Sequence, residues 1–273
     1  EKLNAINSEM VPGARAGAEK AGDFNGKLSR MISRLENKIS DKRMGFLFGG
    51  GKVVMEFDWL NKLVGTLIGV NSENSKAGIK IVDFSEVPSD ILPLIVSLIA
   101  RLSFSVQQWT KSEERHPIAL LCDEAHLYIP NKSSSSSSDE ISLSIFERIA
   151  KEGRKYGLSL VVISQRPSEV NRTVLSQCSN FIAMRLTNTD DQMVIKKLLP
   201  DNLGGFGDIL PILDTGEALV VGDASLLPSR IRIDKPLKTP DSGTVEFWDE
   251  WQKDVKSNRI SIAVNNWRKQ NIG

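Results

Sequence analysis

The 273-residue sequence predicts an α/β fold, a doubly wound and mostly parallel sheet with helices on both faces. A short apolar run, Ile118 to Cys122, is typical of a strand buried on both faces. Similar runs alternate with helical patterns along residues 79–235, which indicates repeated strand–helix–strand units. Hydrophobic residues make up 40% of the chain, enough to fill a substantial core.

Six apolar runs predict strands, and the segments between them predict helices. The predicted strands are Ile79–Phe84, Ile118–Cys122, Leu158–Ser164, Phe181–Leu186, Glu217–Val221 and, at an edge, Arg230–Ile233. The predicted helices span residues 27–41, 57–69, 88–109, 141–156, 170–178 and 190–199. Residues 1–27 are small and polar, and we expect a loose region or short helices there.

The composition argues against several classes of protein. The net charge is +1, with 35 basic and 34 acidic residues, so any DNA contact has to be local. Cys122 and Cys178 are too few for a disulfide framework and are expected to be core thiols of an intracellular protein. Two histidines without cysteine clusters argue against a zinc site. No apolar run is long enough to predict a membrane span.

Two adjacent acids, Asp123 and Glu124, follow the central strand directly. Open α/β sheets bind ligands at the carboxyl ends of their strands. Adjacent residues of an extended chain point in opposite directions, so the two acids must have different tasks. In a Walker B interpretation, Asp123 holds Mg²⁺, and Glu124 orients and polarises a water for attack on a phosphate. The alternative is a strand followed by acids for structural reasons, and the motif alone does not decide.

A glycine-rich segment, Gly45 to Val54, invites comparison with a phosphate-binding loop, but the pattern does not fit. A P-loop has a glycine, four residues, Gly-Lys, and then Ser or Thr. Here Phe46 occupies the position of the first glycine, and Val53 occupies that of the hydroxyl residue. We therefore interpret Gly49 to Gly51 as a flexible turn.

Polar residues follow three of the predicted strands, in the order that a motor ATPase needs. After the acid pair comes a helix ending in EGRKYG, then a strand ending in Ser164-Gln165-Arg166-Pro167, and then a strand ending near Arg185. Adjacent strand ends converge on one crevice in a doubly wound sheet. Phosphoryl transfer requires an acid pair, a polar group on the γ-phosphate, and an arginine that neutralises transition-state charge.

Four stretches of the sequence, in this order, resemble the HerA ATPases, which are hexameric double-stranded-DNA translocases of the FtsK/HerA branch of the P-loop fold. They are LLCDEAHLYIP, RIAKEGRKYGLSLVVISQRPSEV, LSQCSNFIAMRLTN and TGEALVVGD. The resemblance covers about residues 79–235 and includes IVDFSEVPSDI. The letters DEAH also fit superfamily 2 helicases. Those need Ser-Ala-Thr on the next strand, which here ends in Ser-Gln-Arg-Pro.

The resemblance implies a role for each site residue. Asp123 is similar to the Walker B metal-site acid, Glu124 to the catalytic glutamate, and Gln165 to the polar γ-phosphate sensor. Arg154 is similar to an arginine that reaches the nucleotide across a subunit interface, with Arg148 as a second choice. The alternatives are an ordinary strand-end amide for Gln165 and helix-end arginines that pair with local acids.

The resemblance also implies a RecA-like P-loop NTPase core with a helical insertion and a C-terminal extension. We expect residues 1–77 to be a helical region of the ATPase domain, 78–235 the core with Walker B and sensor, and 236–273 an extension. The tryptophans of this extension predict that it docks on the core or on a neighbouring subunit. The family carries its Walker A motif upstream of this region, so we expect a fragment that binds ATP poorly alone.

By resemblance, the expected activity is ATP hydrolysis with Mg²⁺, coupled to movement on double-stranded DNA by a cytoplasmic homohexamer without membrane attachment. An effector protein such as a nuclease is the expected partner, in DNA end processing or in phage defence. The alternative is a ring-shaped scaffold that assembles and regulates an attached effector, with ATP hydrolysis secondary.

Overall fold

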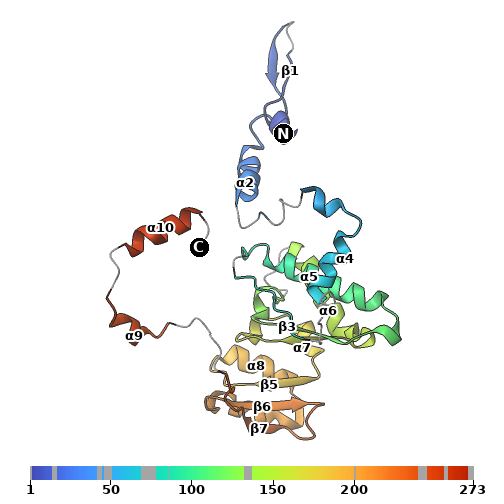
Figure 1. Cartoon of the computed structure of the whole chain (residues 1–273), viewed down its shortest axis with the longest axis vertical. Coiled ribbons are helices and arrows are strands. Elements are labelled where there is room, and N and C mark those ends of the chain that lie inside the picture. The colour runs from blue at the N-terminus through green and yellow to red at the C-terminus, as the bar shows by residue number, and fades with distance from the viewer. Residues whose placement is uncertain are drawn as a thin grey trace. The chain divides into compact units, whose positions relative to one another are not determined.

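The computed structural model describes residues 2–13, 17–41, 45, 51–68, 78–85, 87–131, 137–199, 201–238, 245–254 and 258–269. These residues form a mixed α/β structure (Figure 1). The chain divides into two compact units. One comprises Glu1–Lys62, Ser85–Val87 and Trp248–Gly273, and the other comprises Leu63–Phe84 and Pro88–Phe247.

The larger unit is built around two parallel strands, β3 (Ile118–Cys122) and β4 (Leu158–Val162). Their register runs from Ile118 opposite Leu158 to Cys122 opposite Val162. The crossover consists of α6 (Ser137–Glu152) and the 3₁₀ turn η6 (Gly153–Tyr156). Parallel pairing places the carboxyl ends of β3 and β4 at one edge of the sheet and the C-terminus of α6 at the opposite edge.

Helices α5 (Leu92–Trp109) and α6 pack together and cover one face of this strand pair. Phe104 of α5 and Phe146 of α6 are almost completely buried, and burial of such a side chain contributes about 2–3 kcal/mol. The remaining core of this unit is aliphatic and aromatic: Val96, Ala100, Cys122, Ala125, Tyr128, Ile129, Leu143, Ile145, Ile149, Leu158 and Val174.

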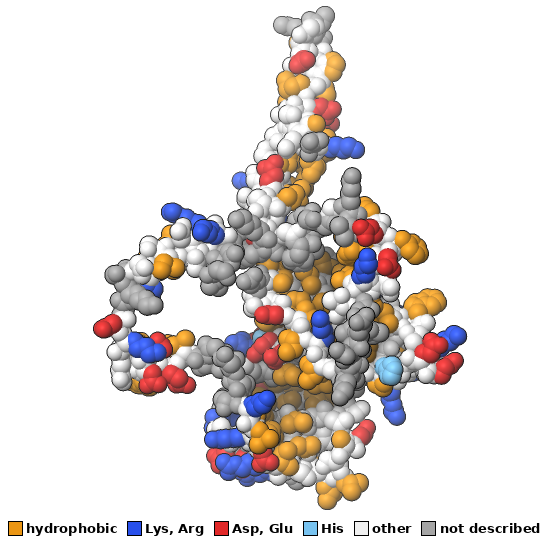
Figure 2. All heavy atoms as spheres, in the orientation of Figure 1, with side chains coloured by type: hydrophobic (Ala, Val, Ile, Leu, Met, Phe, Trp, Pro, Cys, Tyr) orange, Lys and Arg blue, Asp and Glu red, His pale blue; other side chains and the backbone are white. Residues whose placement is uncertain are grey.

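The opposite face of β3 and β4 carries exposed apolar side chains in the described part of the chain. Leu121 is 66% exposed, and Val161 and Ile163 are also exposed, whereas their sequence neighbours face the core. Figure 2 shows hydrophobic side chains at the molecular surface in this region. The prediction that the central strand is buried on both faces is therefore wrong here, because the helices that contact the strands lie on one face.

A second sheet of three strands lies in the same unit. It contains β5 (Asn180–Ala183), β6 (Glu217–Gly222) and β7 (Ser229–Arg232), all antiparallel. Its core includes Leu210, Leu213 and Leu219, with contributions from α8 (Thr189–Leu198) and the 3₁₀ segment η8 (Asp201–Ile212). The predicted mostly parallel pairing does not apply to this sheet. The connection between β6 and β7, residues 223–228, is a hairpin loop, which allows antiparallel pairing only.

The predicted strand at Ile79–Phe84 is also wrong. These residues are described, but they have no regular structure, and Ile79 and Ile81 are 93% and 82% exposed. A strand requires a hydrogen-bonded neighbour, and among the described residues none of the paired strands lies against this segment. Its alternating apolar pattern indicates a preference for strand structure, but no described strand lies beside it to supply the hydrogen bonds.

Most helix predictions are confirmed, with bounds shifted by a few residues. Beside the helices already given, the structure has α2 (Ser29–Ser40), α4 (Trp59–Ile68) and α7 (Arg172–Ser176). The N-terminal segment contains α1 (Lys2–Asn7) and a hairpin of β1 (Met10–Pro12) and β2 (Glu19–Ala21), and the hairpin was not predicted. Short 3₁₀ turns are η2 (Gly51–Met55), η3 (Ser112–Glu114), η4 (Ala125–Leu127) and η7 (Pro167–Glu169).

The C-terminal extension forms two helices, α9 (Phe247–Trp251) and α10 (Arg259–Lys269). Trp248, Trp251 and Trp267 are each more than two-thirds exposed. Docking of this extension on a core or a neighbouring subunit stays a prediction. The predicted turn at Gly49–Gly51 lies outside the described residues except for Gly51. In the described part of the chain no helix is both long and apolar enough to cross a membrane.

The backbone turn that leads from α6 into β4 requires glycine at two positions. Gly157 has a φ of +70°, in the left-handed region. A Cβ on Gly153 would lie 2.3 Å from the carbonyl oxygen of Leu158, far inside van der Waals contact. The buried Gln107 amide donates to the carbonyl oxygens of His116 at 2.7 Å and of Gly157 at 3.1 Å, which ties this turn to the start of β3.

Gly153→Ala should destabilise the protein by about 1–3 kcal/mol, because the added methyl group collides with backbone that cannot move without disturbing β4. Gly205→Ala is the matched control, since a Cβ there meets no atom within 4 Å. Denaturant unfolding of both variants checks the expectation. Equal stability of the two variants would contradict the close approach of Gly153 to the Leu158 carbonyl oxygen.

Candidate functional site

The candidate site begins at the carboxyl end of β3, where the chain turns sharply. Glu124 has φ +47° and ψ +43°, the left-handed conformation, which costs a non-glycine residue about 1–2 kcal/mol. The hydroxyl of Tyr128 donates to the carbonyl oxygen of Asp123 at 2.7 Å, and the Leu127 N–H donates to the Glu124 carbonyl oxygen at 2.9 Å. These two bonds hold the turn closed.

Backbone pairing between the two strands continues beyond their ends. The Ile163 N–H donates to the Cys122 carbonyl oxygen at 2.9 Å, and the Ala125 N–H donates to the Ile163 carbonyl oxygen at 3.0 Å. The residues that follow β4, Ser164 and Gln165, are thereby brought beside Glu124. The predicted convergence of the two strand ends is confirmed for Glu124 and Gln165.

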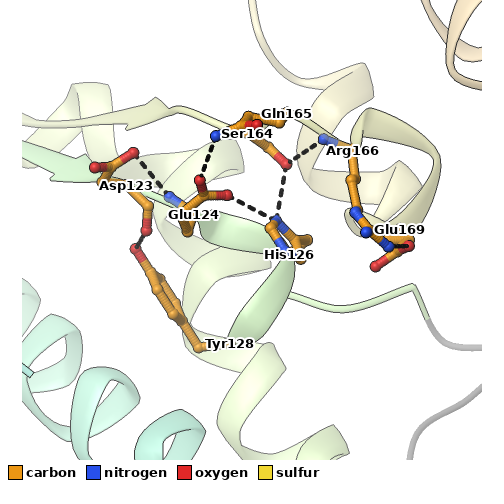
Figure 3. Close-up of polar contacts among 8 residues, drawn as sticks. All are labelled: Asp123, Glu124, His126, Tyr128, Ser164, Gln165, Arg166 and Glu169. Carbon is orange, nitrogen blue, oxygen red and sulfur yellow. Dashed lines mark hydrogen bonds and ion pairs between the residues drawn. The ribbon is translucent and has the colours of Figure 1, made fainter. Parts of the chain in front are cut away.

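Both oxygens of the Glu124 carboxylate have a partner (Figure 3). The Gln165 amide nitrogen Nε2 donates to Oε1 at 2.8 Å. His126 Nδ1 lies 3.3 Å from Oε2, with the His126 side chain 15% and the Glu124 side chain 37% exposed. Asp123 is exposed, and its Oδ1 accepts the Glu124 backbone N–H at 2.9 Å. Glu124 and Gln165 therefore form a direct pair, whereas Asp123 faces solvent.

A serine connects this pair to the turn after β4. Ser164 Oγ lies 3.1 Å from His126 Nδ1 and accepts the Arg166 backbone N–H at 3.0 Å. The Arg166 side chain pairs with Glu169 at 2.8 Å. Sequence reasoning missed His126, Ser164 and Tyr128 as parts of this cluster. The signal that could have identified them was their position in the sequence. His126 and Tyr128 lie in the turn after the acids, and Ser164 directly precedes Gln165.

The structure does not bring the two predicted arginines to the carboxylates. Arg154 lies in η6 and Arg148 in the last turns of α6, both at the sheet edge opposite to Glu124. The Arg148 guanidinium lies over the Phe104 ring, 4.6 Å from its centroid, and its Nε is 3.5 Å from Glu152. Arg154 is exposed, and its side chain has no ion pair with any described residue.

Arg185, the arginine predicted at the end of another strand, belongs to a different sheet from Glu124. It follows β5, which belongs to the antiparallel sheet and pairs with β6 rather than with β3 or β4. Its side chain is exposed. The expected convergence therefore includes the ends of β3 and β4 but not the end of β5 within the described residues.

Asp123 can supply one oxygen ligand to a divalent cation. No group of three metal-ligating side chains occurs among the residues that the structure describes. Mg²⁺ is ordinarily bound by one or two carboxylates together with substrate phosphates and water, and does not need an all-protein cage. An exposed aspartate oxygen at a strand end fits that requirement.

Cys122, the last residue of β3, lies under this turn. Burial raises the pKa of its thiol to about 11, and a hydrogen bond with Tyr128 acts in the opposite direction. The thiol is therefore neutral and poorly nucleophilic at physiological pH, as predicted for a core cysteine. The pKa of the less buried Cys178 is raised in the same way.

Because the pKa of Cys122 is raised in the folded state, its contribution to stability is complete below the thiol's unfolded pKa of 9.0 and is lost as the pH rises towards about 11. The free energy of unfolding should fall over this window, and the fall should be smaller in Cys122→Ala. Urea titrations at a series of alkaline pH values test this. An equal fall in the wild type and in Cys122→Ala would contradict the assignment.

No family model matches the chain, but individual relatives do. The DNA double-strand break repair helicase HerA of Sulfolobus acidocaldarius is 28% identical over 269 residues, which are 96% of this chain and 53% of that protein. HerA of Sulfurisphaera tokodaii is 28% identical over 197 residues, 69% of this chain and 38% of that protein. HerA of Pyrococcus furiosus is 37% identical over 118 residues, 43% of this chain and 20% of that protein.

Among solved structures, the genome packaging NTPase B204 from Sulfolobus turreted icosahedral virus 2, in complex with ATP-γ-S, has a TM-score of 0.43. It is 14% identical, and the match covers 63% of this chain and 72% of that chain. The chain thus spans about half or less of the length of the curated relatives described above.

Proposed function

We propose that this chain, a homologue of the HerA helicases over most of its length, is part of an ATP-hydrolysing motor that moves on double-stranded DNA. One observation carries the proposal. Glu124, directly after β3, is paired at 2.8 Å with Gln165 from the end of the adjacent parallel strand. A catalytic carboxylate beside a polar amide is the arrangement that ATP hydrolysis needs.

In this proposal Asp123 holds Mg²⁺, which neutralises charge on the phosphates when it is bound. Glu124 orients and polarises the attacking water. Gln165 contacts the γ-phosphate, and to do so its amide has to leave Oε1 of Glu124 or share its second N–H. The exposure of Asp123 and the partial exposure of Glu124 leave both carboxylates accessible to a nucleotide.

Arg154 is proposed to act on the nucleotide site of a neighbouring subunit. Its place at the opposite sheet edge separates it from Glu124 of its own chain by the length of β4, roughly 17 Å for five residues. Its side chain is exposed and has no ion pair with a residue that the structure describes, so it is available to another subunit. Arg148 is the weaker candidate, because Phe104 and Glu152 already hold its guanidinium.

The complete assembly is proposed to be a cytoplasmic homohexamer whose subunits have a RecA-like, doubly wound core, with an effector such as a nuclease. DNA end processing or phage defence is the proposed setting. The relatives' names, as double-strand break repair helicases, favour the first. A net charge of +1 favours DNA binding confined to a channel rather than over the whole surface.

A scaffold that assembles an effector, with ATP hydrolysis secondary, is the second candidate. It is favoured by the exposed tryptophans of α9 and α10, since aromatic side chains are enriched at protein interfaces. A scaffold should still assemble its effector when hydrolysis is abolished.

Glu124→Gln should lower ATP turnover of the intact protein, including any residues beyond this chain, by about 10²-fold or more. Glu113→Gln, an exposed acid in η3, is the control and should retain full activity. Duplex DNA should raise wild-type turnover, and the increase should fall as salt rises, because phosphate contacts release counterions. Turnover that ignores DNA would favour the scaffold, and normal turnover by Glu124→Gln would refute the site.

Mixed assemblies test Arg154. Arg154→Ala and Glu124→Gln should each be inactive alone. Co-assembled, they should regain turnover, because some interfaces then combine an intact Glu124 from one subunit with an intact Arg154 from the next. Arg172→Ala, another exposed arginine, should retain activity and serves as the control. Failure of the mixture to recover activity, with assembly confirmed by mass, would show that Arg154 does not act between subunits.

A further inference from the structure

We infer that His126 is a positioning residue for Glu124, in which an Nδ1–H anchored at the Ser164 hydroxyl sets the orientation of the carboxylate. This inference rests on the proposed catalytic role of Glu124 and identifies a residue that prepares it. His126 itself does not need to touch nucleotide or water.

The first support is that the carboxylate is held from two directions. Gln165, from the turn after β4, contacts Oε1 at 2.8 Å, and His126, from η4, lies 3.3 Å from Oε2 (Figure 3). A carboxylate held at one oxygen still rotates about its terminal bond, whereas contacts at both oxygens fix its plane. If Gln165 turns towards a phosphate, His126 remains as the contact that fixes the orientation of Glu124.

The second support is the direction of the hydrogen bonds. The contact of His126 Nδ1 with Ser164 Oγ is compatible with either tautomer, and we assign the hydrogen to Nδ1 because an unprotonated Nδ1 would place its lone pair 3.3 Å from a carboxylate oxygen that can only accept. Ser164 Oγ already accepts from the Arg166 N–H at 3.0 Å and retains a second lone pair for His126 Nδ1 at 3.1 Å. In the assigned tautomer, Nδ1–H donates to Ser164 Oγ and lies beside Oε2 of Glu124, and Nε2 is the unprotonated nitrogen.

The third support is the rigidity of the element that carries the histidine. Ala125, which precedes it, is completely buried, and its N–H is bonded to the Ile163 carbonyl oxygen at 3.0 Å. Tyr128, which follows in the same turn, is also buried and bonded to Asp123. The backbone of His126 is thus held in place, and the contact with Ser164 sets the orientation of the imidazole ring. This is the packing that a positioning residue requires.

Three substitutions separate positioning from simple packing. In His126→Asn the amide nitrogen takes the place of Nδ1, whereas in His126→Gln it takes the place of Nε2, and His126→Ala has no donor. We expect the asparagine variant to retain most ATP turnover. The glutamine and alanine variants should lose about tenfold to a hundredfold in kcat, with the KM for ATP within about twofold of wild type.

Thermal unfolding of the three variants provides the control for folding. If kcat follows Tm rather than the position of the donor, His126 is a packing residue and the inference is wrong. Equal kcat for the asparagine and glutamine variants, at equal stability, would overturn it as well.

The tautomer of His126 gives a measurement that does not depend on activity. The chain has two histidines, so His116→Gln assigns the ¹⁵N signals of the ring. At mildly alkaline pH we expect Nδ1 protonated and Nε2 bare in the wild type, and a loss of this preference in Glu124→Ala. A bare Nδ1 in the wild type overturns the inference. Absence of ATP turnover in the wild-type intact protein would instead refute the proposed function, while the tautomer would still decide the pairing.

Discussion

The parallel pairing of β3 and β4 is the constraint on which the rest of this site depends. If the register of β3 against β4 shifted by one residue, side chains would point to the opposite face of the sheet. Glu124 and Gln165 would then no longer meet. The ladder bonds beyond the strand ends, from Ile163 to Cys122 and from Ala125 to Ile163, carry that register into the turns. The helices α5 and α6 then hold the pair through one buried face.

The sequence was sufficient to predict this part of the molecule because its signals are local and agree with one another. A continuous apolar run, an abrupt change to acids, and a helix between two such runs together specify a parallel crossover unit. The positions of Asp123, Glu124 and Gln165 at one edge follow from that topology alone. The resemblance to HerA ATPases added the expected roles, and similarity to HerA helicases along most of the chain agrees with it.

Other features depend on partners that a sequence pattern does not contain. Ile79–Phe84 has strand-like alternation, but a strand exists only when a neighbour supplies its hydrogen bonds. The antiparallel order of β5, β6 and β7 depends on how a hairpin folds back, which apolar runs do not encode. His126 was not predicted because its role depends on Ser164, 38 residues further along the chain. Only the folded turn brings these two side chains together.

The left-handed backbone at Glu124 lowers the stability of the fold at the residue proposed to be catalytic. It is the one non-glycine residue with a positive φ among those the structure describes. A glycine would adopt this conformation without strain and, on backbone grounds, would make the fold more stable. The carboxylate is nonetheless present at this point of the turn, beside Gln165 and His126. Glycine would relieve this backbone strain but would remove the carboxylate, so the turn carries a stability cost for which the proposed role of Glu124 supplies a reason.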